Sequence, residues 1–185
     1  MRRRDLVLGS LASLTLGKEA WADKGTKFEV DSIYVPQVVQ FSGEHEAGTI
    51  IVDALNRFLY LKEESGTARR YGIGVGKAGL AFTGTATVGR KAKWPSWRPT
   101  ANMIKRAPKK YAKYADGLPG GPQNPLGSRA LYLFRDGRDT LYRIHGTTEP
   151  WTIGKAVSNG CVRMINEHVE DLYERVSIGT TVIVI

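Results

Sequence analysis

The sequence predicts a mainly β domain with one clear α-helix near the C-terminus. Segments with a period of two, rich in β-branched and aromatic residues, recur along most of the chain. Several of them are separated by short turn-forming stretches, as in β-hairpins. A helical period is clear only over residues 166–176. With 185 residues, the chain is long enough for one domain with a buried core.

The first 22 residues have the features of a cleaved export signal. Residues 2–4 are three arginines, residues 6–17 are an apolar run without charge, and Ala20-Trp21-Ala22 is a small-x-small cleavage site. The apolar run has twelve residues and is too short to span a bilayer. The arginines also loosely resemble a twin-arginine signal. We therefore expect an exported, periplasmic protein without stable membrane insertion after cleavage; an uncleaved N-terminal anchor is the alternative.

The predicted strands begin after a polar, extended lead-in over residues 23–45. Two of them form a hairpin across residues 53–56, and the next two are spaced by glycines. These strands are Thr49–Asp53, Arg57–Leu61, Arg70–Gly76 and Thr83–Arg90. The glycines do not lead into a helix, and no acidic ribose-binding residue follows them. We therefore reject a dinucleotide-binding loop here.

Residues 94–127 differ in composition from both of their flanks. They hold six of the eight prolines, two tryptophans and many lysines. A long stretch of this kind inside a compact domain is usually functional or disordered. The run Trp94-Pro-Ser-Trp97 is too apolar for a free linker, so we predict a lid-like insertion with a short helix around Thr100–Arg106. A poorly ordered surface loop is the alternative.

The strongest hairpin prediction joins Ala130–Phe134 to Thr140–His145 through Asp136-Gly137. It places His145 at the end of a strand, where a rigid scaffold can aim the imidazole. Alternation along the strand puts His145 on the face opposite Ile144. If the segment from Cys161 is also extended, Val162 and Met164 point into the core, and Cys161 shares the open face with Arg163.

The C-terminal helix is predicted to begin at Asn166, whose side chain can cap it. Its apolar stripe consists of Val169, Leu172, Tyr173 and Val176. Gly179 ends this segment, and residues 181–185 are predicted to close the chain as a buried strand.

The chain is basic, with a formal net charge of +9. The predicted signal accounts for +2 of this, so the mature chain carries about +7. Between Gly66 and Ala115 there are twelve Lys and Arg and no Asp or Glu. Such a surface favours an anionic partner, and for an exported protein the candidates are wall polymer, lipid or acidic peptide. A solvated basic face without a single partner is the alternative, whereas an export signal argues against nucleic acid.

The only cysteine of the chain, Cys161, follows one of its three histidines, His145, after a short interval. An odd cysteine in an exported chain suggests an intermolecular bridge or a reactive thiol. A free thiol, with a pKa of ~8.5, is a weak nucleophile until a base such as imidazole takes its proton and holds the ion pair. Gly160 allows a sharp turn with N–H groups facing an oxyanion. We interpret these residues as a Cys/His acyl-transfer centre; a small buried hydrophobe is the alternative for Cys161.

The residues around this centre resemble the catalytic domain of the L,D-transpeptidases (YkuD-type) of bacterial cell walls. The resemblance rests on Ile-His-Gly-Thr at 144–147, Pro-Trp-Thr-Ile-Gly at 150–154 and Ser-Asn-Gly-Cys-Val-Arg-Met at 158–164, and it extends over residues 46–185. It implies a β-sandwich-like fold of mixed sheets and peptidoglycan stem peptides as substrate. It also implies Cys161 as nucleophile and His145 as general base and acid.

The same resemblance implies roles for neighbouring residues. The backbone carbonyl of Gly146 would orient His145, and backbone N–H groups around Gly160 and Cys161 would form the oxyanion hole. The residues implied in supporting the site or binding substrate are Ser158, Asn159, Arg163, Thr147 and Trp151, and Arg163 would also hold a substrate carboxylate. Many family members carry histidine where this chain has Asn159. Neither a metal nor a cofactor is implied.

These observations predict that Cys161 forms a thioester with the diamino acid of a stem peptide, releasing D-alanine, and that an amine then accepts the acyl group. The acceptor could be another stem, a lipoprotein lysine or a free D-amino acid. Two alternatives stay open: a carboxypeptidase or wall-protein hydrolase that uses the same cysteine, and a non-catalytic wall-binding module.

Overall fold

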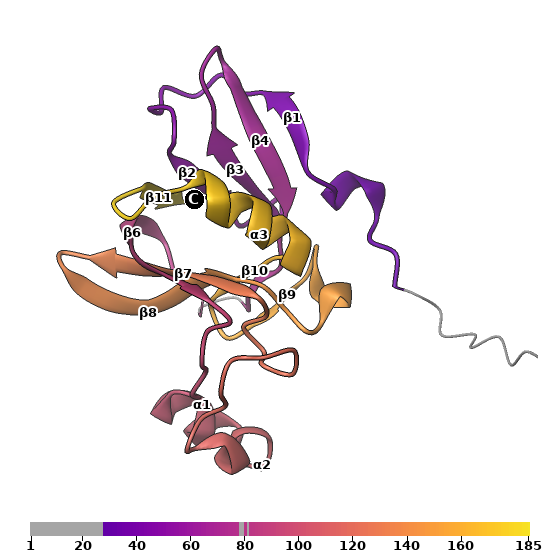
Figure 1. Ribbon diagram of the computed structural model, residues 1–185, viewed down its shortest axis with the longest axis vertical. Helices are drawn as coiled ribbons and strands as arrows, with labels where there is room; N and C mark the ends of the chain where they lie inside the picture. The colour runs from indigo at the N-terminus through magenta and orange to yellow at the C-terminus, as the bar shows by residue number, and fades with distance from the viewer. Residues whose placement is uncertain (1–27, 78–79, 81) are drawn as a thin grey trace, which may run out of the picture.

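The computed structural model describes residues 28–77, 80 and 82–185. The predicted export signal therefore lies outside the described residues. Within them, the chain forms the mainly β domain that the sequence predicts (Figure 1). No helix among these residues is both long and apolar enough to span a membrane.

The described strands form a mixed nine-stranded sheet in the order β1-β4-β3-β2-β11-β6-β7-β8-β10, and β5 and β9 pair separately. The strands before the insertion are β1 Gln37–Gln40, β2 Ile50–Asp53, β3 Phe58–Lys62, β4 Thr67–Gly72, β5 Val75–Gly76 and β6 Gly84–Lys93. Those after it are β7 Arg129–Arg135, β8 Arg138–His145, β9 Ala156–Ser158, β10 Val162–Arg163 and β11 Thr181–Val184.

Both predicted hairpins are confirmed. Strands β2 and β3 pair antiparallel, with Ile51 opposite Tyr60. Strands β7 and β8 pair antiparallel across Asp136 and Gly137, which both have positive φ, as a two-residue hairpin turn requires. The C-terminal strand β11 lies parallel to β2 and antiparallel to β6. It thereby joins the two halves of the sheet.

The extended lead-in belongs to the sheet. A 3₁₀ turn over Ser32–Tyr34 precedes β1, which pairs antiparallel with β4 at the edge. The Tyr34 ring packs near Phe58 of β3, with 5.8 Å between the ring centroids. The folded unit therefore starts before residue 46, where the sequence analysis began the domain.

Helix α3, Asn166–Arg175, packs on the sheet through its buried residues Val169 and Leu172. It contacts both halves of the sheet. The Tyr71 hydroxyl of β4 donates to Asp171 Oδ2 at 2.7 Å, and Lys91 Nζ of β6 donates to the carbonyl of Tyr173 at 2.6 Å. Tyr173 also packs against the core, as the stripe predicts.

The predicted cap of α3 is wrong. Ile165 occupies the N-cap position, and Asn166 is the first helical residue. Its side-chain Oδ1 instead accepts hydrogen bonds from the backbone N–H groups of Ser128 and Thr147, each at 3.2 Å. Asn166 thus holds together two loops that flank the end of β8, a role that depends on contacts distant in sequence.

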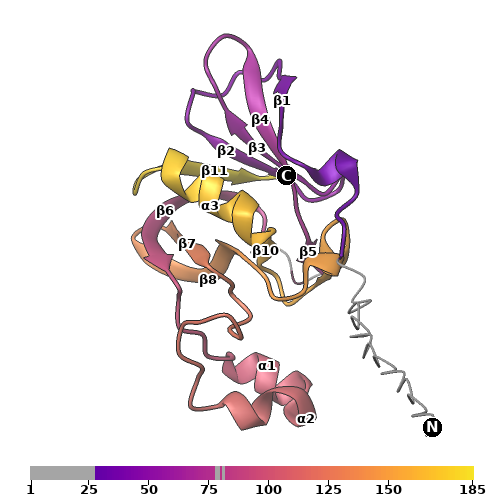
Figure 2. The same cartoon turned by 45° about the vertical axis from the view of Figure 1, so that its right-hand side comes forward.

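The insertion between β6 and β7 contains short helical segments. It contains α1 Ala101–Arg106, α2 Pro108–Tyr111 and a 3₁₀ turn over Ala112–Tyr114. The Thr100 hydroxyl caps the predicted first helix by accepting from the N–H of Met103 at 3.2 Å. The sequence analysis missed α2, which begins at Pro108, a favoured first helical residue. Figures 1 and 2 both show α1 and α2 projecting from the sheet on the side opposite α3.

Candidate active site

Two neighbouring parallel strands bring Cys161 and His145 together. Cys161 lies in the turn between β9 and β10, and His145 ends β8. Strand β10 pairs with β8 so that Arg163 lies opposite His145. Val162 and Met164 are buried in the core, as predicted, so Cys161 projects to the opposite face, beside Arg163.

Cys161 and His145 both line one cavity of about 570 Å³. The sheet forms one wall of this cavity with residues from β8, β10 and the turn before β10. The insertion forms the facing wall with Trp97, Met103, Arg106, Lys110, Tyr111 and Tyr114. Residues of the insertion therefore share a cavity with the candidate nucleophile.

The imidazole of His145 is held in one tautomer. Its Nδ1 lies 2.5 Å from the carbonyl oxygen of Gly146, and a carbonyl can only accept, so Nδ1 carries the proton. Nε2 is then the nitrogen that can accept a proton. His145 is only 4% exposed, and burial lowers its pKa to about 4. The imidazole is therefore neutral at pH 7.

The thiol of Cys161 is also neutral at rest. It is partly exposed, and it donates to the carbonyl of Leu141 at 3.9 Å. Burial raises its pKa above that of a free thiol. The ion pair expected from the sequence is thus not formed beforehand, and the proton has to move as the sulfur attacks.

Leu141 reaches the thiol through an irregularity in β8. The β7–β8 register shifts between Tyr132 and Phe134, and Leu141 has a φ of 64°. A positive φ is uncommon for a residue with a branched side chain. Bulges of this kind often re-aim groups beside active sites. Here the bulge points a backbone carbonyl at the sulfur.

The low pKa of His145 predicts an unusual pH profile for acylation of Cys161. A general base works only when it is neutral, and His145 is neutral above about pH 4. We expect kcat/KM for acylation to stay level as the pH falls from 7 to about 5, where an ordinary histidine with a pKa of ~6.5 would be mostly protonated. Stopped-flow acylation across this range measures it. A half-maximal rate near pH 6.5 would contradict the prediction.

Ser158 holds the turn that carries Cys161. Its hydroxyl donates to the carbonyl of Cys161 at 2.6 Å and accepts from the N–H of Gly160 at 3.1 Å. Gly160 has a φ of 129°, and a Cβ there would lie 2.6 Å from the carbonyl oxygen of Leu80. The glycine is therefore required by the fold. Its N–H, expected in the oxyanion hole, is already used by Ser158.

Asn159 fastens this turn to the insertion. Its Nδ2 donates to the Tyr111 hydroxyl at 2.8 Å, and Arg106 Nη2 donates to its Oδ1 at 3.3 Å. Asn159 was expected to bind substrate, whereas neither Tyr111 nor Arg106 was a predicted site residue. No spacing in the sequence connects them, because the contact joins residues 48 apart in the chain.

Replacing Tyr111 with Phe tests this connection. The variant loses the hydroxyl that accepts from Asn159 but keeps the ring, which packs on Trp97 with 6.3 Å between centroids. One neutral hydrogen bond contributes ~0.5–1.5 kcal/mol, so we expect acylation to slow about 2- to 10-fold. Tyr114→Phe is the matched control, because Tyr114 also packs on Trp97. Equal rates for both variants would show that the Asn159 contact does not affect the reaction.

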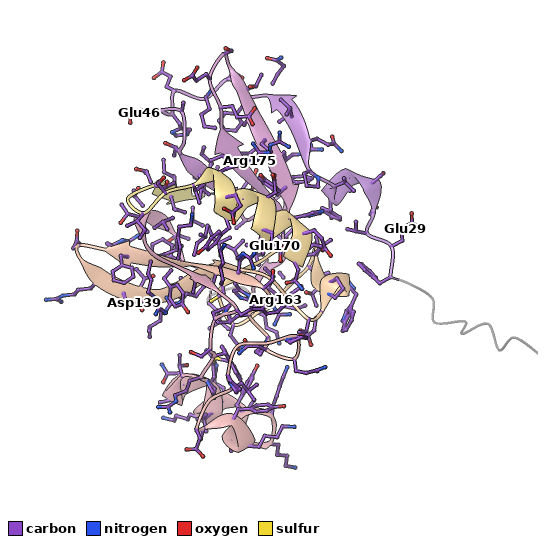
Figure 3. The ribbon with its side chains drawn as sticks, viewed as in Figure 1. Glu29, Glu46, Asp139, Arg163, Glu170 and Arg175 are labelled. Atoms are coloured by element: carbon purple, nitrogen blue, oxygen red, sulfur yellow. The ribbon has the colours of Figure 1, made fainter. Side chains whose placement is uncertain are left out.

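Three residues predicted to bind substrate have other surroundings. Arg163, labelled in Figure 3, lines the cavity, but its Nη1 is paired with Glu149 Oε2 at 2.6 Å, so a substrate carboxylate would have to compete with Glu149 for it. Thr147 is buried, and its hydroxyl accepts from the N–H of Glu149. Trp151 is 52% exposed and is not among the residues that line the cavity. The structure therefore does not bring Thr147 or Trp151 to the site, and Arg163 is held as part of the wall.

A family model for the L,D-transpeptidase catalytic domain (YkuD) matches residues 47–184 of this chain. Among curated proteins, the chain is 34% identical over 153 residues to the probable L,D-transpeptidase ErfK/SrfK of Escherichia coli (strain K12). That alignment covers 82% of this chain and 48% of the relative. The chain thus spans about half the length of the curated relatives it matches.

Among solved structures, one from Brucella melitensis shares 58% sequence identity with a TM-score of 0.58, covering 82% of this chain and 93% of that one. It is described as a probable carnitine operon oxidoreductase. An L,D-transpeptidase from Mycobacterium smegmatis has a TM-score of 0.54 at 18% identity, covering 74% and 58% of the two chains, and shows the shared fold. In this chain, the glycine-spaced run enters β5, and the next described element is β6 rather than the helix that a dinucleotide-binding motif requires.

Proposed function

This chain belongs to the L,D-transpeptidase catalytic-domain family, and from that premise we propose that it cross-links peptidoglycan stem peptides through a thioester on Cys161. The observation that supports this most is that the only thiol of the chain and a neutral, oriented imidazole line the same cavity. Wall peptides as substrate place its work outside the cytoplasm, in agreement with the predicted export signal. The catalytic unit of the proposal covers residues 46–185, with the edge strand β1 packed on it.

In the first half-reaction, the sulfur of Cys161 attacks the carbonyl that joins the diamino acid of a stem peptide to its terminal D-alanine. The thiol proton passes to Nε2 of His145, while the Gly146 carbonyl stabilises the imidazolium through Nδ1–H. Because Ser158 already occupies the N–H of Gly160, we assign the oxyanion to the backbone N–H of Cys161. When the C–N bond breaks, His145 returns the proton to the amine of D-alanine, which leaves.

In the second half-reaction, an amine attacks the thioester. Neutral His145 takes a proton from the attacking amine, the C–S bond breaks, and the thiolate of Cys161 recovers a proton from His145. The choice between amine and water decides between a transferase and a hydrolase. The wall formed by the insertion limits access of water to the thioester, which favours the amine.

Incubation of the protein with stem tetrapeptides distinguishes a transferase from a hydrolase. We expect mass spectrometry of the products to show cross-linked dimers and released D-alanine. Shortened monomers alone would instead support the carboxypeptidase alternative. Incubation of the protein with isolated wall material that contains lipoprotein, followed by mass spectrometry, tests a lysine acceptor in the same way.

The non-catalytic alternative predicts a different pattern. The lysines at 109, 110 and 113 are exposed on the insertion, where they could contact an anionic polymer. If wall binding were the whole function, reversing these charges would abolish binding, and removal of the thiol would change nothing. The fixed tautomer of His145 and the cavity around Cys161 support the enzyme instead.

A further inference from the structure

Cys161 also lines a second cavity, which shares part of its lining with the first. This cavity has a volume of about 590 Å³ and is lined by Cys161 together with three arginines, Arg90, Arg98 and Arg143. His145 lines the first cavity but not this one. Cys161 therefore borders both the space that holds the proposed base and a space lined by three further arginines.

Two of these arginines belong to a row of side chains that crosses the sheet and ends at the thiol. Arg90 on β6 lies opposite Tyr132 on β7, and Tyr132 lies opposite Arg143 on β8. Val162 lies opposite Ile144, which puts Cys161 beside Arg143. Residues at one level of adjacent strands share a face and are ~4.8 Å apart along the row. We call Arg90, Tyr132 and Arg143 the arginine row.

The tyrosine ring of the arginine row holds both guanidinium groups. Arg90 Cζ lies 3.6 Å from the Tyr132 ring centroid, and Arg143 Cζ lies 4.2 Å from it. Stacking fixes the plane of a guanidinium and leaves its N–H edge free for a planar, bidentate acceptor. The row is thus preorganised for an oxyanion such as a carboxylate.

Internal pairing consumes part of this positive charge. Arg143 makes two hydrogen bonds to the carboxylate of Asp139, at 2.7 and 2.8 Å; Asp139 is labelled in Figure 3. Arg98 donates to the backbone carbonyl of Asp116, which also lines the cavity. Three guanidinium groups against these two carboxylates leave a net charge of +1.

Arg90 carries the remaining charge. Its side chain is exposed, and within the described part of the chain it makes no hydrogen bond or ion pair with another residue. An arginine that is held on an aromatic ring in the cavity of a nucleophile, without a hydrogen-bonded partner, keeps its N–H groups available for a ligand.

We propose that Arg90, seated on Tyr132, binds the α-carboxylate of the D-amino acid that leaves Cys161 or attacks its thioester. This inference rests on the proposed function. In the donor peptide, the carboxylate of terminal D-alanine lies one residue beyond the carbonyl under attack, ~3.8 Å along the chain. Arg90 lies three strands away from Cys161, but its guanidinium lies over the ring of Tyr132, one strand nearer, and Arg90 and Cys161 line the same second cavity.

The chemistry gives one carboxylate site a use in both half-reactions. D-Alanine leaves as an amine whose α-carbon carries a carboxylate. An acceptor that attacks through the amine of a D-amino acid presents the same arrangement of amine, α-carbon and carboxylate to the thioester. The same guanidinium can therefore orient the leaving amine and the entering amine, while bond making and proton transfer stay with Cys161 and His145.

The test compares a stem tetrapeptide that ends in D-alanine with the same peptide ending in D-alanine amide. For the wild-type chain, we expect kcat/KM for acylation of Cys161 to be about 10- to 100-fold higher with the free carboxylate, the range expected for one hydrogen-bonded charge pair. Arg90→Gln should remove this preference by slowing only the carboxylate peptide. Arg90→Lys should keep part of the preference, since lysine keeps the positive charge but lacks the paired N–H groups of a guanidinium. Arg138→Gln, at the turn of the β7–β8 hairpin, controls for net charge.

Equal slowing of both peptides by Arg90→Gln would show a structural role and overturn the proposal, as would an unchanged preference. A second measurement does not depend on turnover. In the Cys161→Ala background, calorimetric titration should give a Kd for the carboxylate peptide that rises about 10-fold on Arg90→Gln, while the amide peptide binds alike to both. If the wild type binds the carboxylate peptide through Arg90 but is never acylated, the proposed function fails and the carboxylate site stands. The acceptor role is tested in the same variants by adding a free D-amino acid to the preformed thioester. The amide of that D-amino acid is the comparison.

Discussion

We expect the replacement of Cys161 with Ala to abolish acylation by a carbapenem, which is the largest effect predicted here. The wild-type chain should gain the mass of one adduct, and the variant should gain none. Cys161 is the only cysteine of the chain, so no second thiol can take over. Loss of a covalent nucleophile typically slows the reaction at least ~10⁴-fold, because no remaining group can form the intermediate. Intact-mass spectrometry measures both species directly.

The fold should survive this change. The Cys161 side chain is partly exposed, and Cys161 lies in the turn before β10 rather than among the core residues, which include Val162 and Met164. We therefore expect the thermal unfolding midpoint to stay close to that of the wild type. The cross-linking of stem peptides should disappear with the adduct. Equal labelling of the wild type and Cys161→Ala would refute the assignment of the nucleophile.

Replacing His145 with Gln should slow acylation about 10²- to 10⁴-fold, the range that a positioned general base contributes. The thiol pKa is raised by burial, so very little thiolate exists at pH 7 without a base. Glutamine cannot take the proton. It is preferred over alanine because its amide can still donate to the Gly146 carbonyl and so limits the cost of an unpaired buried acceptor.

His45→Gln is the matched control for this variant. His45 lies next to Phe41, with 6.3 Å between the ring centroids, and does not line the cavity of Cys161. We expect this variant to be acylated at the wild-type rate. A His145→Gln variant that keeps the wild-type rate and pH profile would remove His145 as the base, even if Cys161 remained the site of the adduct.

The electrostatics of the pair explain why both changes should be so costly. Burial favours the neutral form of each group, lowering the pKa of His145 and raising that of Cys161. The sulfur becomes reactive only when the proton transfers during attack. Arg143 and Arg163 lie near both groups and stabilise the thiolate while they disfavour the imidazolium. The site thus depends on the geometry of proton transfer rather than on a standing ion pair.

Local patterns sufficed for much of the fold. Alternation along residues 130–134 and 140–145, with Asp136-Gly137 between them, predicted the β7–β8 hairpin and placed His145 at its end. The stripe that includes Val169 and Leu172 predicted α3. These features depend on residues a few positions apart, so a short window of sequence contains their physical cause.

Predictions about side-chain partners were less successful. Asn166 was expected to cap α3 and instead joins two loops. Arg163 was expected to support the site and also to hold a substrate carboxylate, and its pairing with Glu149 was not predicted. Trp151 was expected in the site and lies outside the cavity. A polar side chain can satisfy its hydrogen bonds in several ways, and its sequence neighbours do not decide among them.

The sequence by itself determined the chemistry available to this protein: one thiol, a histidine at a strand end, a glycine turn before the thiol, and a basic segment rich in proline and tryptophan. Only the tertiary structure decided how these meet. The parallel pairing of β10 with β8 sets Cys161 beside His145, the docking of Tyr111 on Asn159 closes the cavity, and the register of four strands aligns Arg90 with the thiol. Each of these contacts closes a long loop, and its register is set by burial of the whole sheet, a property that no local period of the chain contains.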